Sequence, residues 1–294
     1  MPSHSSEAAV FARPADVDVD MFGLTHRGLE RAQNQDHFML ATVHPQIVVH
    51  GTSLSRTEDL RLSGDRLGTI LLVADGVGGS SDGAAAAQLA TEAVTTYVAS
   101  SLRCYHDLGA GRDPAFLSAL HETAMRAHDA VRAEATARSS GSNMATTLTL
   151  GIGVWPWLYV VQVGDSRAYI FSQGQLRQIT RDQTLAQAML DVGAMRPEQL
   201  QRSPLNHILA SAIGADEPTP VVSRVDVSER GCVLLFCTDG LTKHVSDEEI
   251  AELCANGMAA EPLARRLLEL ALERGGSDNI TLVIACAPEK RQSS

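Results

Sequence analysis

Several common sequence features are missing from this chain of 294 residues, and each absence excludes a class of protein or site. No apolar run reaches 18 residues, so no membrane-spanning helix is expected. The five cysteines form no CxxC pair and show no metal-type Cys/His spacing, which argues against a zinc site or a disulfide framework. Cys232, Cys237 and Cys286 lie in apolar runs and are expected in the core, which favours a reducing cytoplasm.

Basic residues are scarce relative to acidic ones, because 24 Lys and Arg stand against 35 Asp and Glu and the net charge is −11. This balance argues against non-specific binding to nucleic acid or to an anionic membrane. The first 20 residues lack a basic start followed by an apolar stretch, so they do not resemble a signal peptide. Residues 1–18 are instead predicted to be disordered, and residues 288–294 to be frayed.

The apolar pattern predicts a single domain over residues 19–287, with no internal repeat and no long linker. Strands and helices come in clusters rather than in strict alternation, which favours an α+β fold with mostly antiparallel sheets. Strands are predicted at 68–74, 145–154, 158–163, 167–171, 233–237 and 279–287, and helices at 82–101, 113–138, 246–255 and 259–273. Residues 44–68 are predicted to be a surface insertion between two strands, with a short hairpin at 47–49.

What the sequence does contain is a set of five aspartates, each beside a strand-like run and a tight polar turn. Taken singly, each is equally well explained as a turn or capping residue. Together, carboxylates that converge from distant segments make an all-oxygen site suited to Mg²⁺ or Mn²⁺. Two such ions close together activate water for phosphoester hydrolysis. The five are Asp36, Asp75, Asp165, Asp239 and Asp278.

Two further groups fit this chemistry. Arg31 lies five residues before Asp36, and arginine suits bidentate phosphate recognition, although its usual place is the exposed surface. Gly76 follows Asp75, and its backbone carbonyl is a suitable ligand for a hard ion.

Seven short motifs, taken in order, resemble those of the metal-dependent protein phosphatases (the PPM, or type-2C, serine/threonine phosphatase family) in their bacterial form. Each motif is weak alone, but the ordered set from residue 25 to residue 281 is specific. The motifs cover residues 25–28 with 31–36, 73–79, 144–147, 163–169, 206–214, 237–241 and 277–281.

The resemblance implies a four-layer αββα sandwich, in which two central antiparallel β-sheets are flanked by helices and two Mn²⁺ or Mg²⁺ ions lie at one edge. Position by position, it implies that Asp75 bridges both ions and that the Gly76 carbonyl binds one of them. Asp239 and Asp278 would complete the shell of the other ion. Asp165, with Asp239, would match a third and weaker metal site.

The implied reaction is the hydrolysis of phosphoserine and phosphothreonine by direct attack of a metal-bridging hydroxide, without a phosphoenzyme. Asp36 would orient water and Arg31 would bind the substrate phosphate, so the catalytic candidates are Asp36, Asp75 and Asp239. The implied partners are phosphorylated proteins and a cognate serine/threonine kinase whose signalling the enzyme reverses. A cytoplasmic monomer is the expected form.

The chain departs from the family pattern at three positions. Gln35 replaces a common glutamate and is expected to weaken one metal shell. Val77 stands where animal members have a histidine proposed as general acid, so the leaving group would take its proton from water. Gln183 replaces a common histidine, and a structural role is expected. Residues 184–215 match the family's flap, with a helix to Asp191, a break at Gly193 and a second short helix beside the active site.

Two other functions stay open on the sequence. One is a catalytically weak or silent family member that acts as a regulatory binding module. Loss of Asp75, Asp239 or Asp278 would indicate it, and none is lost. The other is a phosphoester hydrolase of different specificity, for phosphotyrosine or a small phosphoester, which a comparison of phosphopeptides distinguishes.

Overall fold

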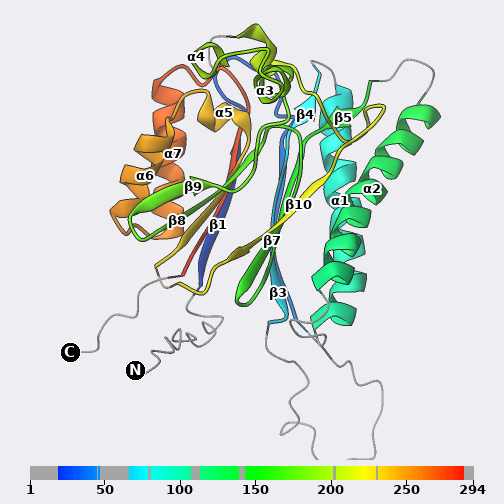
Figure 1. Ribbon diagram of the computed structural model, residues 1–294, viewed down its shortest axis with the longest axis horizontal. Helices are drawn as coiled ribbons and strands as arrows, with labels where there is room; N and C mark the ends of the chain where they lie inside the picture. The colour runs from blue at the N-terminus through cyan, green and yellow to red at the C-terminus, as the bar shows by residue number, and fades with distance from the viewer. Residues whose placement is uncertain are drawn as a thin grey trace, which may run out of the picture.

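A computed structural model gives the fold and describes residues 19–44, 46, 66–78, 81–106, 113–138, 143–200, 203–229 and 231–287. The predicted termini at 1–18 and 288–294, the hairpin at 47–49 and nearly all of the predicted insertion at 44–68 lie outside these residues. In the described part, two sheets lie face to face and helices cover both outer faces (Figure 1). This arrangement confirms the predicted α+β class and the four-layer αββα sandwich.

The two large sheets each contain five strands, and all of their paired strands run antiparallel. The first sheet has the order β1 (Asp20–His26), β12 (Ile280–Cys286), β11 (Val233–Cys237), β8 (Arg167–Ser172) and β9 (Gln175–Gln178). The second has the order β10 (Val221–Asp226), β7 (Trp157–Val163), β6 (Leu148–Val154), β3 (Gly68–Ala74) and β2 (His37–Val43). A short ladder joins β4 (Gly76–Val77) to β5 (Ala145–Thr146).

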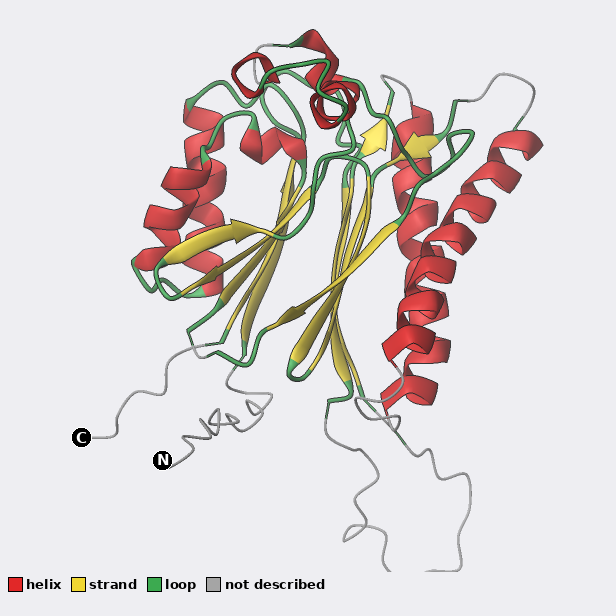
Figure 2. Cartoon of the chain, in the orientation of Figure 1, coloured by secondary structure: helices red, strands yellow, loops and turns green. Residues whose placement is uncertain are grey.

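The helices fall into two outer pairs and a group of short pieces at one end of the sandwich (Figures 1 and 2). The pair over the second sheet is α1 (Ser81–His106) and α2 (Asp113–Ala137), and the pair over the first is α6 (Asp247–Ala255) and α7 (Ala260–Glu273). The short pieces are α3 (Leu185–Asp191), α4 (Pro197–Leu200), the 3-10 turn η3 (Pro204–His207) and α5 (Asp239–Thr242). Among the described helices, none combines the length and the hydropathy that a bilayer crossing requires.

The central strands are apolar on both faces because both faces are covered. On β3, Ile70 and Leu72 pack under the helices of the second sheet, whereas Leu71 and Val73 pack between the two sheets. The same alternation runs along β11 and β12. A strand buried on both faces reads as a continuous apolar run, which explains why these strands were predictable from sequence.

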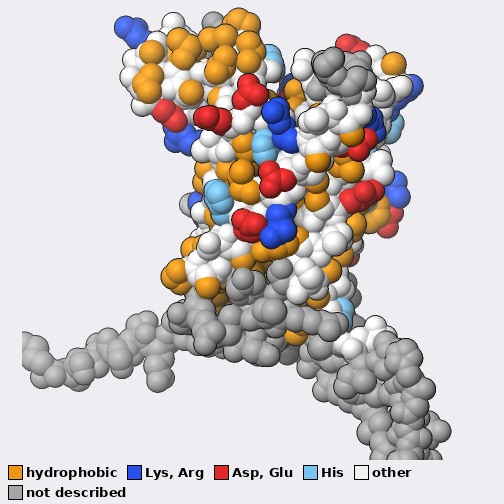
Figure 3. All heavy atoms as spheres, turned by 90° about the vertical axis from the view of Figure 1, so that its right-hand side faces the viewer, with side chains coloured by type: hydrophobic (Ala, Val, Ile, Leu, Met, Phe, Trp, Pro, Cys, Tyr) orange, Lys and Arg blue, Asp and Glu red, His pale blue; other side chains and the backbone are white. Residues whose placement is uncertain are grey.

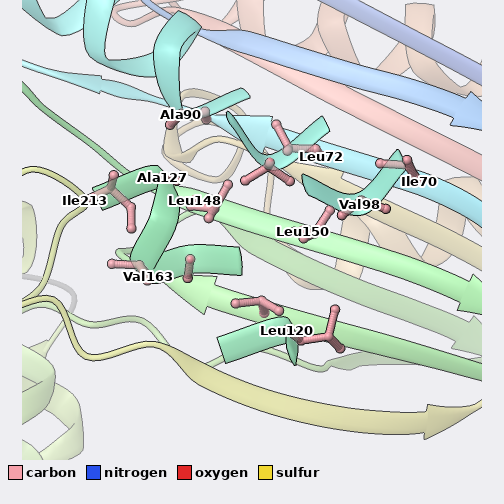
Figure 4. Packing of buried hydrophobic residues seen from close by; sticks show 14 of the residues in the cluster. Ile70, Leu72, Ala90, Val98, Leu120, Ala127, Leu148, Leu150, Val163 and Ile213 are labelled. Atoms are coloured by element: carbon pink, nitrogen blue, oxygen red, sulfur yellow. The ribbon is translucent and has the colours of Figure 1, made fainter. Parts of the chain in front are cut away.

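Small side chains let α1 approach the second sheet closely. Ala90 and Val98 of α1 lie over Leu72, Leu148 and Leu150 of the sheet (Figure 4). The outer face of this helix pair carries acidic and basic side chains that are interspersed (Figure 3), as the helical ion pairs of α2 require. The helix pair therefore covers the outer face of the sheet whose strands β3 and β7 lead to Asp75 and Asp165.

Two sequence predictions need correction. The predicted strand at 145–154 is interrupted at Thr147, because the chain there leaves the β4–β5 ladder and enters the second sheet as β6. The strands β1, β9 and β10 were not predicted, and β2 was expected only as an unbounded strand before residue 44; all four are edge strands of the two sheets. By contrast, the helix predicted at 246–255 is present as α6, and Ser246 and Glu249 form a capping box at its start.

Candidate metal centre and active site

The five predicted aspartates converge at one end of the sandwich, although they come from distant parts of the chain. Asp36 precedes β2, Asp75 joins β3 to β4, and Asp165 follows β7. Asp239 begins α5, and Asp278 precedes β12. All but Asp36 line one cavity of about 230 Å³, and Asp36 is buried behind it with 4% of its surface exposed.

Asp36 is held by hydroxyl groups on one oxygen only. Its Oδ2 accepts hydrogen bonds from Thr238 Oγ1 at 2.8 Å and from Thr281 Oγ1 at 2.7 Å. Its Oδ1 is buried and has no hydrogen-bond partner in the described structure. Burial, only partly offset by these hydroxyls, raises the pKa of Asp36 to about 7. One oxygen therefore remains available for a ligand.

The backbone around Asp75 is fixed by two threonines. Thr147 Oγ1 accepts the Asp75 N–H at 2.9 Å, and the Asp75 carbonyl accepts from Thr147 N and Thr146 Oγ1, both at 2.8 Å. A Cβ at Gly76 would overlap the backbone of Gly83, so only glycine fits where the chain passes α1. These contacts fix the strand end from which the Asp75 carboxylate and the Gly76 carbonyl border the cavity.

Asp239 and Asp278 share a cation that sequence reasoning did not identify. Lys243 Nζ lies 2.6 Å from Asp239 Oδ2 and 2.6 Å from Asp278 Oδ2. Arg31 donates to Asp278 through Nε and Nη2, both at 2.8 Å. Burial acts to raise the pKa of Asp278, but the hydrogen bonds from Lys243 and Arg31 outweigh it and hold that pKa below its usual value.

Asp165 lies at the boundary between this cavity and a larger polar groove of about 990 Å³. Its side chain is buried, and burial together with the charge of Asp239 raises the pKa of Asp165 to about 8. The groove continues between α3 and α6, where Arg167 forms a bidentate ion pair with Asp182. Asp165 and Asp239 therefore lie together where the cavity meets the groove, and a third metal site there stays a prediction.

The charge of the site fits divalent cations. When all five carboxylates are ionised, they meet two cationic side chains, Arg31 and Lys243, and the formal charge of the site is 2 − 5 = −3. Burial and the charges of the other four aspartates raise the pKa of Asp75 well above its usual value. Asp239 Oδ1, like Asp36 Oδ1, is buried and has no hydrogen-bond partner in the described structure. Buried oxygens without donors and an excess of negative charge are what hard cations neutralise.

The carboxylates do not form a finished coordination shell. In the described residues, no three His, Cys, Asp or Glu side chains are arranged to hold a metal ion together. Both oxygens of Asp278 already accept charged donors, with Arg31 at Oδ1 and Oδ2 and Lys243 at Oδ2. A metal ion that binds Asp278 therefore competes with at least one of these cationic groups.

Two further residues of the site, Asn279 and Lys243, were not identified from the sequence. Asn279 is 5% exposed and fixes the segment that carries Arg31. Its Oδ1 accepts from Gln35 N, and its Nδ2 donates to the carbonyls of Arg27 and Gln33. Lys243 is the C-cap of the one-turn helix α5 and lies four residues after Asp239. This i+4 spacing from a candidate ligand could have identified it.

The positions that depart from the family pattern divide into two kinds. Gln35 and Val77 line the cavity and therefore bear on its chemistry. Gln183 lies away from the cavity and is structural, since it accepts from Gly164 N and donates to the Thr219 carbonyl. His207 of η3 lines both the cavity and the groove.

Comparison with known proteins agrees with the fold and the motifs. The family model described as "Protein phosphatase 2C" matches residues 55–280. A curated relative, "Serine/threonine protein phosphatase PstP" of Mycobacterium tuberculosis, is 36% identical over 236 residues, which are 80% of this chain and 43% of the relative. The chain thus spans less than half the length of that relative.

Two solved structures have the same architecture. The crystal structure of the M. tuberculosis phosphatase PstP/Ppp aligns with a TM-score of 0.73 at 29% identity, covering 92% of this chain and 99% of that one. The PstP catalytic domain in complex with two manganese ions aligns with a TM-score of 0.68 at 29% identity, covering 91% and 97%. With its ordered motifs, its two-sheet sandwich and these matches, the chain belongs to the protein phosphatase 2C family.

Proposed function

We propose that the chain is a metal-dependent protein serine/threonine phosphatase that uses two Mn²⁺ or Mg²⁺ ions, with a third and weaker ion at Asp165 and Asp239. The observation that carries this proposal is the convergence of five carboxylates from both sheets on one end of the sandwich, where Arg31 lines the same cavity. The name of the M. tuberculosis relative, and the two manganese ions in its catalytic domain, support the same function.

Four groups of this chain would hold the two main ions: the carboxylates of Asp75, Asp239 and Asp278 and the carbonyl of Gly76. When bound, the ions supply the activation of water and the neutralisation of phosphoryl charge. The rigid strand ends that carry these groups keep the ligands in place between turnovers.

Arg31 binds and orients the phosphoester in this proposal. Its side chain is 48% exposed, and its guanidinium already makes a two-pronged contact with a carboxylate, which has the same planar acceptor geometry as two phosphoryl oxygens. A substrate phosphate would take over these donors. Arg31 would then offset part of the charge that the phosphoryl oxygens carry during transfer.

Asp36 orients the attacking water. Thr238 and Thr281 hold its Oδ2, which leaves Oδ1 to accept a hydrogen bond from the water that would attack phosphorus. Val77 has no proton to give, so the departing serine or threonine oxygen takes its proton from water in the polar cavity.

The partners that this function implies are phosphorylated proteins and a cognate serine/threonine kinase. We further propose a cytoplasmic monomer, with residues 19–287 as one catalytic domain and residues 184–215 as its flap. The lining of the cavity by His207 and Leu209 supports this assignment of the flap. Movement of the segment would change access to the site.

The proposal is tested with matched phosphoserine, phosphothreonine and phosphotyrosine peptides in Mn²⁺, with phosphate release as the readout. Release from the first two peptides, lost in Asp75→Asn, is the expected result. Release from phosphotyrosine alone would favour the phosphoester hydrolase of other specificity. No release from any peptide by folded, Mn²⁺-loaded protein would favour the silent binding module.

A further inference from the structure

Lys243 is a rare residue type in this chain, and it lies among the aspartates of the proposed metal site. The chain has 24 basic residues, and only two of them, Lys243 and Lys290, are lysines. One of these two stands among the aspartates of the site, with its side chain 24% exposed. A chain that otherwise relies on arginine has here a compact ammonium group rather than a planar guanidinium.

The fold directs this ammonium between two carboxylates. Asp239 begins the one-turn helix α5, and Lys243 follows at the i+4 position on the same side. Asp278 approaches from the start of β12. The ammonium lies 2.6 Å from an oxygen of each, Asp239 Oδ2 and Asp278 Oδ2. A small, localised positive charge between two carboxylates takes the position that a hard metal ion also favours.

Most carboxylate oxygens of Asp239 and Asp278 already have hydrogen-bond or ion-pair donors. Asp278 Oδ1 accepts from Arg31 Nε and from Asn279 N, while its Oδ2 accepts from Arg31 Nη2 and Lys243 Nζ. Asp239 offers only Oδ1 without a partner. A divalent ion that binds both aspartates must therefore displace a cationic donor from Asp278, either Arg31 from Oδ1 or Arg31 and Lys243 from Oδ2, and it can use both Asp239 oxygens only if Lys243 leaves.

We propose that Lys243 is a tethered cation that competes with one divalent ion for Asp239 and Asp278. This inference rests on the metal use in the proposed function and concerns only the ion shared by these two residues. While the ammonium is in place, Asp239 and Asp278 share its positive charge and bind that ion weakly. When the ion binds, the ammonium leaves its carboxylates and turns toward the neighbouring groove, which Lys243 also lines.

The first test measures Mn²⁺ binding by titration calorimetry in metal-free wild type, Lys243→Met and Lys243→Arg. Lys243→Met keeps the apolar stem and removes the charge, so we expect at least about tenfold tighter binding of the weaker ion. Lys243→Arg keeps the charge and is expected to stay close to wild type. Arg181→Met, which removes an exposed cation paired with Asp191 on the groove wall, is the matched control and should leave the affinity unchanged.

Unchanged or weaker Mn²⁺ binding by folded Lys243→Met would overturn the proposal. Lys243 would then be a phosphate-binding residue or a structural one, and inorganic phosphate titrated into the same variants would separate these two roles. Wild type that hydrolyses no phosphoester at any Mn²⁺ concentration would count against the proposed function instead. The two failures are therefore distinguishable.

A second test uses the wild-type chain and does not depend on a variant that folds. Brief acetylation with an amine-reactive ester, followed by peptide mass spectrometry, compares Lys243 with Lys290 as the internal reference. Because ammonium and ion exclude each other, added Mg²⁺ should increase the labelling of Lys243 relative to Lys290. Equal or lower labelling of Lys243 in saturating Mg²⁺ would contradict the exchange.

Discussion

Replacing Asn279 by alanine should both destabilise the protein and loosen the segment that carries Arg31. The Asn279 side chain makes three hydrogen bonds to the backbone of residues 27–35, at 2.8 Å to Gln35 N, 2.8 Å to the Arg27 carbonyl and 2.9 Å to the Gln33 carbonyl. Since the side chain is 5% exposed, little water reaches these groups in the native protein. At about 1 kcal/mol for each bond, the expected loss of unfolding free energy is about 3 kcal/mol.

The catalytic consequence follows from the same contacts. Arg31 depends on this segment for its position, so Asn279→Ala should lower kcat/KM by about tenfold or more, since tenfold corresponds to only about 1.4 kcal/mol. The two residues should also be coupled. Arg31→Ala should reduce kcat/KM less in the Asn279→Ala background than in wild type, because the guanidinium there is already misplaced.

The assay is urea unfolding of metal-free protein, together with steady-state hydrolysis of p-nitrophenyl phosphate by the four proteins of this double-mutant cycle. Asn256→Ala, an exposed asparagine after α6, is the control and should change stability by less than about 0.5 kcal/mol. A loss below about 0.5 kcal/mol in Asn279→Ala, or strictly additive effects on kcat/KM, would refute the reasoning.

Three further predictions follow from the site and the core. Asp239→Asn removes a charged ligand shared by the metal sites and should lower turnover by orders of magnitude with the fold retained; near-normal turnover in limiting Mn²⁺ would contradict the assignment. Asp165→Ala should leave p-nitrophenyl phosphate hydrolysis largely intact and act on phosphopeptides or on the Mn²⁺ concentration required, so equal losses on both substrates would count against a separate third site. Burial lowers the pKa of His128, whose Nδ1 accepts the Gly214 N–H at 3.1 Å. The stability from neutral His128 is therefore present above about pH 6.5 and lost as the pH falls below it, so the dependence of Tm on pH should flatten in His128→Gln but not in the exposed His121→Gln.

The bounds of the central strands could be predicted from sequence, and those of the edge strands could not. Strands such as β3 and β11 are buried on both faces and therefore appear as continuous apolar runs. Edge strands meet water on one side and therefore mix polar with apolar residues. Strand β9 reads QLRQ, and β10 reads VVSRVD, in which even Val221 is 48% exposed. A short, half-polar segment has no local signal that distinguishes it from a loop.

The interruption at Thr147 shows a second limit. The run at 145–154 is locally consistent with one strand. It is divided only because the hydroxyl of Thr147 pairs with the backbone of Asp75, which is distant in the sequence. Thr147 Oγ1 accepts the Asp75 N–H, while β5 pairs with β4 and β6 pairs with β3. The break is thus a requirement of the site and is not visible in the segment itself.

The candidate ligands were predictable in kind, because each aspartate adjoins an apolar run and a turn. Their convergence was not, because it depends on strand order, which brings β3 and β7 into one sheet and β11 and β12 into the other. Lys243 and Asn279 were missed for the same reason. A lysine after a helical turn and an asparagine in a turn are common, and only the tertiary contacts with Asp278 and with the segment of Arg31 reveal their roles.

The most direct test of the central claim is the hydrolysis of p-nitrophenyl phosphate by purified, metal-free protein, measured as Mn²⁺ or Mg²⁺ is added and then removed with EDTA. The claim is that the converging aspartates form a metal centre for phosphoester hydrolysis. We expect activity to appear with added metal, to vanish with EDTA, to return when metal is added in excess, and to be absent throughout in Asp75→Asn. Folded wild type that is inactive with both metals, or equally active in EDTA, would contradict the account.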